Sequence, residues 1–128
     1  MNPALTVLAA ISVLQVKHLI CDFFLQTSHQ IENKGTYGHP GGLIHAGIHI
    51  VGTLPLFLIY PTTVTIAATI LFAEFVLHYH IDWLKNVIGA HYGWTTRDAK
   101  YWWALGVDQF AHQMTYVGMV TALVLLQG

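Results

Sequence analysis

The chain has 128 residues, of which 55% are hydrophobic and only 9% are charged. A soluble domain carries about 25% charged residues, so the charges here are too few to cover a water-exposed surface. The net charge of −1 leaves no basic field for nucleic acid, and the single cysteine, Cys21, excludes an internal disulfide. The composition therefore predicts one domain that has a lipid bilayer as its solvent.

Four apolar segments approach the length of about 20 residues that a helix needs to cross a bilayer. They cover residues 4–26, 42–60, 62–86 and 102–127. Asn2 and Pro3 are typical of a helix start, and Pro55 predicts a kink in the second segment. No basic residue precedes the first segment, as one would in a cleavable signal, so we expect this helix to be retained. These features predict an all-α integral membrane bundle of four transmembrane helices with up-down topology, formed by residues 1–128 as a single domain.

The connections between the segments differ in length and composition. Residues 27–41 are polar, residues 60–62 make a tight turn, and residues 87–101 are rich in aromatic side chains. In this last connection Thr95 and Asp98 have the spacing of a capping box, which could open a short interfacial helix. The tryptophans and tyrosines around it predict an aromatic belt at a membrane surface.

Basic side chains are shared unequally between the two ends of the predicted bundle. The long connections and the adjoining helix end carry four of them, Lys34, Lys85, Arg97 and Lys100, and the opposite end carries none. The positive-inside rule then places the long connections in the cytoplasm and both termini outside it.

Each predicted span contains one pair of polar side chains with the spacing i, i+4. The pairs are His18 with Asp22, His45 with His49, His78 with Asp82, and Asp108 with His112. This spacing places both members of a pair on one helix face, one turn apart. Ionisable groups at such a depth cost roughly 2.5–3.5 kcal/mol each, so we expect all eight to find partners inside the bundle.

The pairs also lie at one depth, because alternate helices of an up-down bundle run in opposite directions. Counted from the cytoplasmic end, a shallower layer holds Asp22, His45, Asp82 and Asp108, and a deeper layer holds His18, His49, His78 and His112. Imidazole and carboxylate groups together suit zinc, iron or manganese, and eight of them suffice for one or two divalent ions. The arrangement is similar to carboxylate-bridged di-metal sites in four-helix bundles. A metal-free polar network or proton path is the alternative.

Other polar residues lie near the four pairs. Glu74 lies one turn beyond His78 and could be a further ligand, a base, or a simple partner of another charge. We expect Lys17 to extend toward the membrane surface and His80 to lie off the face that carries His78. The histidines of the connections, at positions 29, 39 and 91, are expected to be solvated. Gly47 and Gly52 would allow close helix contact.

Four stretches in chain order carry a family resemblance: residues 18–26 (HLICDFFLQ), 43–45 (LIH), 78–85 (HYHIDWLK) and 108–112 (DQFAH), together with Lys34. In this pattern the chain resembles a family of small bacterial membrane proteins known as a domain of unknown function. The resemblance implies a bacterial or phage origin, a four-helix membrane fold and, with the charge bias, a place in the bacterial inner membrane. It implies no activity.

The predicted site favours a membrane-embedded metal-binding protein, and the first hypothesis is a metal-dependent hydrolase. Its substrate would be a lipid or a lipid-linked phosphate near the cytoplasmic interface, where a metal can activate water and polarise a phosphoryl oxygen. Glu74 or a spare aspartate would act as base, and Lys34 or Lys85 would hold the anion.

Three other functions remain open from the sequence. A divalent metal transporter, channel or sensor would use the two layers as steps of a path, although the outer half of every span has few polar ligands. A metal-free proton relay would use the same pairs. A haem redox protein would use histidines on facing helices, although the nearby aspartates fit haem poorly. A homo-oligomer is compatible with each of these functions.

Overall fold

The computed structural model describes residues 2–127, and in that range it contains helices and no strand. This confirms the predicted all-α class for the described residues. Four long helical stretches and one short helix make up the fold. They are α1 (Pro3–Leu19) continued by the π-helical turn η1 (Ile20–Phe24), the short α2 (Ser28–Asn33), α3 (Pro40–Thr53) followed by α4 (Leu56–Ile59), α5 (Val64–Tyr92), and α6 (Ala99–Gln127).

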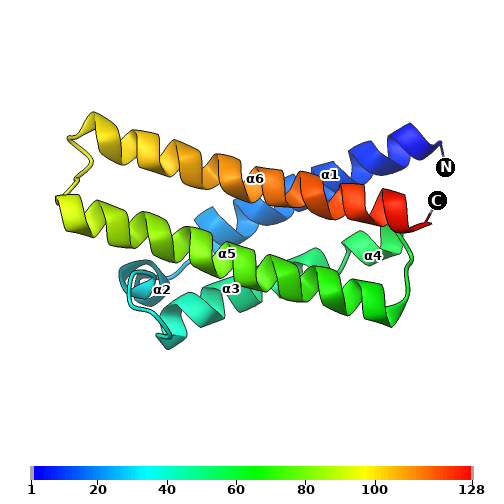
Figure 1. The fold of residues 1–128 in the computed structure, drawn as a ribbon, viewed down its shortest axis with the longest axis horizontal. Helices are drawn as coiled ribbons and strands as arrows, with labels where there is room; N and C mark the ends of the chain where they lie inside the picture. Colours follow the sequence, from blue (N-terminus) through cyan, green and yellow to red (C-terminus); the bar gives the residue numbers. More distant parts are fainter. Residues whose placement is uncertain (1, 128) are drawn as a thin grey trace.

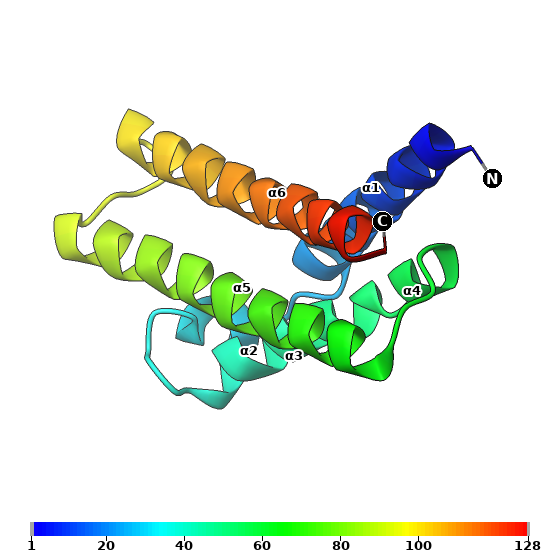
Figure 2. The same cartoon turned by 45° about the vertical axis from the view of Figure 1, so that its right-hand side comes forward.

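The four long stretches lie along one axis and alternate in direction (Figure 1). The beginning of α1, the turn from α4 to α5 and the end of α6 lie at one end, and the α5–α6 connection lies at the other end, on the side of α2 (Figures 1 and 2). Helix α5 packs against both α3 and α6, and α1 packs against both α6 and α3. Polar pairs on alternate stretches are thereby brought to the same level.

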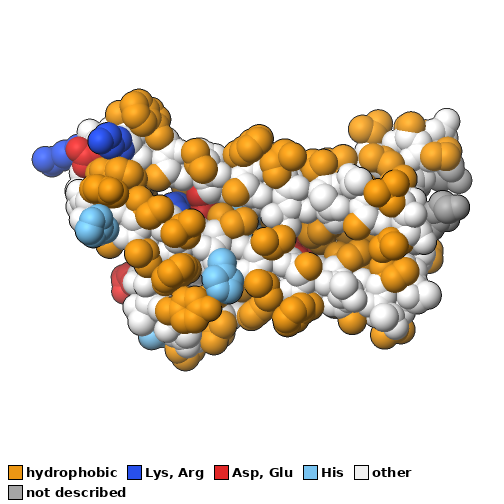
Figure 3. Space-filling view, viewed as in Figure 1, with side chains coloured by type: hydrophobic (Ala, Val, Ile, Leu, Met, Phe, Trp, Pro, Cys, Tyr) orange, Lys and Arg blue, Asp and Glu red, His pale blue; other side chains and the backbone are white. Residues whose placement is uncertain are grey.

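Three helical stretches are long and apolar enough to cross a membrane: Pro3–Phe24, Pro40–Ile59 and Val64–Tyr92. Helix α6 has 29 residues, but Asp108, Gln109, His112 and Gln113 make it less apolar. Large apolar side chains are exposed along the whole molecule, whereas Lys and Arg gather at the end with the α5–α6 connection (Figure 3). Such a surface is typical of contact with lipid, so the chain has the features of a membrane protein.

The predicted break at Pro55 is present, whereas the third predicted span ends later than expected. The helix before Pro55 ends at Thr53, and α4 begins at Leu56, because proline has no N–H to continue the hydrogen-bond ladder. Helix α5 extends beyond the predicted end at residue 86 to Tyr92, where Gly93 with φ 65° provides the left-handed C-cap.

Among the described residues one of the two hydrogen bonds of the predicted capping box is present, and the Asp98 N–H donates instead to the carbonyl oxygen of Thr95 at 2.9 Å. The Thr95 N–H donates to Asp98 Oδ2 at 2.7 Å, and the helix that follows is α6 itself. The prediction of a separate interfacial helix is wrong, because the longer α5 leaves only a few residues before Ala99.

The polar connection between the first two spans contains structure that the sequence analysis did not predict. Thr27 caps α2 by accepting from the Gln30 N–H at 3.3 Å, and Gln30 and Lys34 are buried. Helix α2 packs against α3 and so covers one end of the bundle.

The interior has two parts of opposite character. Near the termini it is apolar, with fully buried Leu14, Leu56 and Leu123 around Tyr116. In the half near α2 it is polar and contains histidines, aspartates and lysines. The apolar half holds the four stretches together beside the polar half.

Close contact between α1 and α3 depends on Gly52. A Cβ atom at this position would lie 2.7 Å from Lys17 Cγ and 3.3 Å from Cys21 Sγ. At Gly47, on the same helix, a Cβ atom would meet nothing within 4 Å. Of the two glycines predicted to allow helix contact, only Gly52 does so within the described chain.

We expect Gly52→Ala to lower the free energy of unfolding by about 1–3 kcal/mol, because the added methyl group overpacks the α1–α3 contact. Gly47→Ala is the matched control and should be neutral or stabilising, because alanine favours the helix. Denaturant titration of both variants in detergent micelles measures the difference. Equal stability of the two variants would contradict the role given to Gly52.

Candidate metal centre

All eight side chains of the four predicted pairs are buried and converge in the polar half of the bundle. Their exposed fractions range from 0% for His45 and His49 to 7% for Asp22. They come from α1 with η1, α3, α5 and α6, so each long stretch contributes one pair. The i, i+4 spacing and the alternating direction of the helices together produce this convergence.

Asp22 joins α1 and η1 to α3. Its Oδ1 atom lies 2.8 Å from Nε2 of His49 and 3.1 Å from Nε2 of His45. Its Oδ2 atom lies 3.1 Å from Nε2 of His18, one turn earlier. Asp22 lies within the π-helical turn, where the Leu25 N–H donates to the carbonyl oxygen of Ile20 at 2.9 Å. Such turns inside helices are frequent at functional sites.

Asp82 occupies the corresponding place on α5. Its Oδ1 atom lies 3.0 Å from Nε2 of His112. Its Oδ2 atom lies 3.3 Å from Nε2 of His45 and 3.4 Å from Nε2 of His78. Lys34, which follows α2, places its Nζ atom 3.0 Å from the same oxygen. Nε2 of His45 therefore lies between the two carboxylates.

Three imidazole rings pack closely at the centre of this cluster. The ring centroids of His49 and His78 are 3.8 Å apart, and those of His78 and His112 are 4.2 Å apart with an interplanar angle of 30°. Protonated rings at these distances would repel one another. Imidazole binds a metal ion in its neutral form, through a ring nitrogen.

Several of these buried atoms have no hydrogen-bond partner among residues 2–127. They include Nδ1 of His45, His78 and His112 and Oδ1 of Asp108. Nε2 of His45 and of His78 face carboxylate oxygens at 3.1–3.4 Å but without hydrogen-bond geometry. A buried polar atom left unpaired costs about 1–3 kcal/mol, so such atoms require an explanation. A bound ion or ordered water would supply the missing partner.

Two groups within the cluster could hold a metal ion. One comprises Asp22, His45, His49 and His78, and the other comprises His78, Asp82 and His112. In each group the donor atoms lie within 4.8 Å of one another. His78 belongs to both groups.

The other two predicted ligands, His18 and Asp108, lie at the border of the cluster. His18 Nδ1 is 2.8 Å from the hydroxyl of Tyr116, and its Nε2 is 2.8 Å from Oε1 of Gln109. Asp108 Oδ1 lies 3.6 Å from Nε2 of His112. The amide of Gln109 donates to Asp108 Oδ2 at 3.1 Å. Both residues are placed to orient the inner ligands.

Lys17 does not extend to the membrane surface, and the prediction that it does is wrong. Its side chain is buried, forms an ion pair with Glu74, and lies 3.3 Å from Nδ1 of His49 and 3.2 Å from the hydroxyl of Tyr116. The sequence contains a signal for this pair. His18 and His78 both belong to the deeper layer. Lys17 lies one residue before His18, and Glu74 lies one turn before His78, so the two opposite charges lie at a similar depth.

Glu74 therefore lies beyond the two ligand groups and contacts them through Lys17. Its Oε1 atom pairs with Lys17, and its Oε2 atom has no hydrogen-bond partner within the described part of the chain. This arrangement favours the reading of Glu74 as a partner of another charge. Tyr116, which joins Lys17 to His18, was missed by the sequence analysis because its apolar ring is typical of an ordinary core residue.

The remaining histidines lie outside the cluster. His80 is exposed and lies off the face that carries His78, as predicted, with its Nε2 2.9 Å from the Tyr37 hydroxyl. His29 and His91 are exposed, as predicted. His39 is half-buried and accepts from the Gly41 N–H at 3.0 Å, so it caps α3 instead of being fully solvated.

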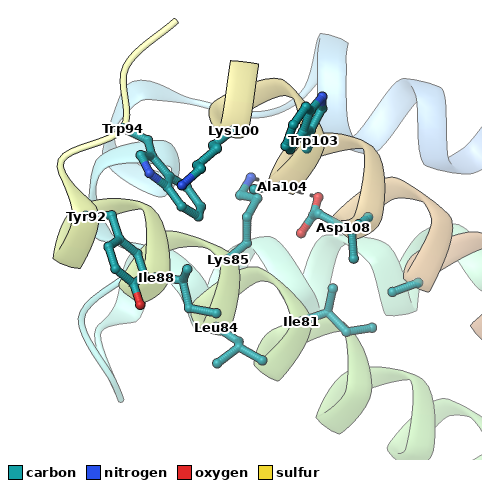
Figure 4. A pocket seen from close by; sticks show the side chains of 12 residues that line it. Ile81, Leu84, Lys85, Ile88, Tyr92, Trp94, Lys100, Trp103, Ala104 and Asp108 are labelled. Atoms are coloured by element: carbon teal, nitrogen blue, oxygen red, sulfur yellow. Dashed lines mark ion pairs between the residues drawn. The ribbon is translucent and has the colours of Figure 1, made fainter. Parts of the chain in front are cut away.

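A groove between α5 and α6 leads to the edge of the cluster. It has a volume of about 630 Å³ and is lined mainly by apolar side chains such as Leu84 and Val107. Lys85 extends from α5 toward Asp108 on α6, and their Nζ and Oδ2 atoms are 3.9 Å apart (Figure 4). Asp108 therefore faces the groove on one side and His112 on the other.

The fold and the site define a class of protein: an all-helical chain with membrane-spanning features and a buried cluster of histidines and aspartates that could hold a metal ion. The chain belongs to the DUF3307 family, described as proteins of unknown function, which matches residues 10–127. This family agrees with the resemblance drawn from the sequence. No curated protein and no solved structure matches the chain.

We expect Glu74→Gln to lower the free energy of unfolding by about 3–5 kcal/mol, because it leaves the Lys17 ammonium buried without its counter-charge. The double variant Lys17→Met with Glu74→Leu should be less destabilised than this single variant, because no unpaired charge remains. Denaturant titration in detergent micelles compares the two, with Glu32→Gln as the control at an exposed position. A Glu74→Gln protein as stable as the wild type would refute the importance of the ion pair.

Proposed function

We propose that this protein is a membrane-embedded metal-binding protein that acts as a metal-dependent hydrolase on a phosphate ester carried by a lipid. The observation that carries the proposal is the convergence of imidazole Nε2 atoms on two carboxylates, Asp22 and Asp82, with Nδ1 of His78 left without a hydrogen-bond partner among the described residues. Zinc, iron or manganese suits this donor set, as one ion or two.

The proposed ligands follow from the two groups of donor atoms. Asp22, His45 and His49 would hold one ion, and Asp82 and His112 would hold a second, with His78 serving one of them. His18 and Asp108 would orient these ligands, as outer partners commonly do in metal sites. When bound, the metal would activate water and polarise a phosphoryl oxygen.

The chain's own residues would bind the substrate and move the proton. Asp108 is the best-placed base, because its Oδ1 atom has no hydrogen-bond partner in the described chain and it lies between the groove and His112. Lys85, at the groove, and Lys34, beside Asp82, would hold the anionic phosphate. Glu74 would support the cluster through Lys17 instead of acting as base.

The competing functions have less support in this geometry. Fully buried Leu14, Leu56 and Leu123 fill the half of the bundle near the termini, which disfavours a transport path within one protomer. Imidazole centroids about 4 Å apart leave no space for a porphyrin between His78 and its neighbours. A metal-free polar network would leave Nδ1 of His78 without a partner among the described residues.

We further propose that α6 is a fourth transmembrane helix in a bacterial inner membrane. Its antiparallel packing against α5 and its length of 29 residues support this, as does the gathering of basic residues at one end of the molecule. The long connections would then lie in the cytoplasm.

Elemental analysis of detergent-purified protein tests metal binding. We expect about one or two transition-metal ions per chain in the wild type and a loss of metal in His49→Ala and Asp82→Ala, because each removes a donor from a group of three or four. His80→Ala is the matched control on α5 and should keep its metal, since His80 is exposed and outside the cluster. Wild-type protein that binds none of the candidate ions would contradict the proposal.

Hydrolysis is tested by phosphate release from phosphatidic acid in mixed micelles, with and without a chelator. We expect Asp108→Asn to keep its metal and to lower kcat about 10²–10⁴-fold, because it removes the proposed base. A metal-loaded wild type with no turnover of any lipid phosphate would leave a metal-binding protein and exclude the hydrolase.

Reporter fusions test the orientation. Alkaline phosphatase fused after the last residue should be active, because that end is proposed to be extracytoplasmic, and a fusion within the α5–α6 connection should be inactive. The opposite pattern would contradict the orientation drawn from the basic residues.

A further inference from the structure

We propose that the groove between α5 and α6 is a binding site for the phosphate headgroup of a membrane lipid, held by Lys85 and Lys100. This inference rests on the proposed function only for the reaction that follows binding. It names where the substrate would bind and which side chains would recognise it.

The groove has two cations at its edge that the fold does not use fully. Lys100 is exposed and forms no ion pair with any residue of the described chain. Lys85 makes one long contact of 3.9 Å with Asp108 and no hydrogen bond within residues 2–127. Both side chains line the same groove, where Lys100 lies across its mouth from Lys85 (Figure 4). Two ammonium groups around one space, one without an ion pair among the described residues and one with a single long contact, suit a phosphate monoester.

The walls of the groove suit acyl chains. Leu84, Ile88 and Val107 line it and are exposed on the outer surface of the helices, so the groove opens sideways. Figure 3 shows basic and acidic atoms side by side in a recess of this largely apolar face. An apolar groove that opens toward the membrane admits a lipid directly from the bilayer.

The aromatic side chains indicate the depth of the groove. Trp94 and Trp103 line it, and the ring of Trp94 stacks on Tyr92 with centroids 5.1 Å apart. Tryptophan and tyrosine concentrate at the level of lipid headgroups, where basic side chains attract anionic lipids. The cations therefore lie where lipid phosphates lie.

The other lateral grooves have a different charge. The groove near the termini between α5 and α6 is lined by Glu74 and by no lysine or arginine. The groove between α1 and α3 is lined by Lys17, whose charge is already paired with Glu74. The groove with Lys85 and Lys100 has two cations beside the one carboxylate of Asp108, so charge complementarity selects it among these three.

Tryptophan fluorescence provides the test, because Trp94 and Trp103 line the groove. Metal-free protein in phosphatidylcholine bicelles is titrated with brominated phosphatidic acid or with brominated phosphatidylcholine. We expect phosphatidic acid to quench at a lower mole fraction, and this preference to fall about fivefold in Lys85→Gln or Lys100→Gln and about thirtyfold in the double variant. Arg97→Gln removes an exposed cation that does not line the groove and should keep the preference.

The outcomes separate this inference from the proposed hydrolase. Equal quenching by both lipids, or equal effects of the lysine variants and Arg97→Gln, would overturn the lipid site even if hydrolysis were found. Displacement of brominated phosphatidic acid by millimolar inorganic phosphate would also overturn it, because the site would then take free phosphate. A lipid preference that depends on both lysines in a protein without turnover would uphold the site and refute the hydrolase.

Discussion

Every ionisable side chain within the bundle must find its partner inside the bundle, because lipid offers none. In this protein Asp22 and Asp82 satisfy that constraint for most of the cluster. Asp22 contacts histidines of α1 and α3, and Asp82 contacts histidines of α3, α5 and α6. Without these two carboxylates the long helices would have few polar contacts at this level. The same contacts that hold the helices together therefore also form the proposed metal centre.

The division of the interior into an apolar and a polar half follows from this constraint. Where Leu56, Leu123 and their neighbours meet, the helices pack by shape alone. Where the histidines meet, several ring nitrogens have no hydrogen-bond partner among the described residues. Apolar side chains of similar volume at these positions would give a bundle that is as stable or more stable. The proposed metal centre would account for a cluster with this cost, and the groove beside Asp108 leads from its edge to the outer surface of the helices.

Much of the site could be predicted from the sequence, because two regular features determine it. The i, i+4 spacing puts His78 and Asp82 on one face, and the alternating direction of the helices puts that face level with the other pairs. Three features depend on contacts that no local pattern encodes. The π-helical turn that holds Asp22 has no sequence signal that we recognise, the burial of Lys17 requires a partner 57 residues away, and α2 is stabilised by packing on α3. A lysine in an apolar segment is typical of a residue that extends to the membrane surface. The burial of Lys17 depends on Glu74, the acid that lies at a similar depth on α5.

The ion pair between Lys17 and Glu74 has a consequence for how the chain enters the membrane. During synthesis α1 leaves the ribosome first, and Glu74 follows 57 residues later. An unpaired lysine in the lipid costs roughly 2.5–3.5 kcal/mol, and the same helix carries His18 and Asp22. Release of α1 alone into the bilayer is therefore unfavourable until α5 arrives. The helices would enter the bilayer as a group, so that assembly of the polar centre becomes a step of membrane insertion.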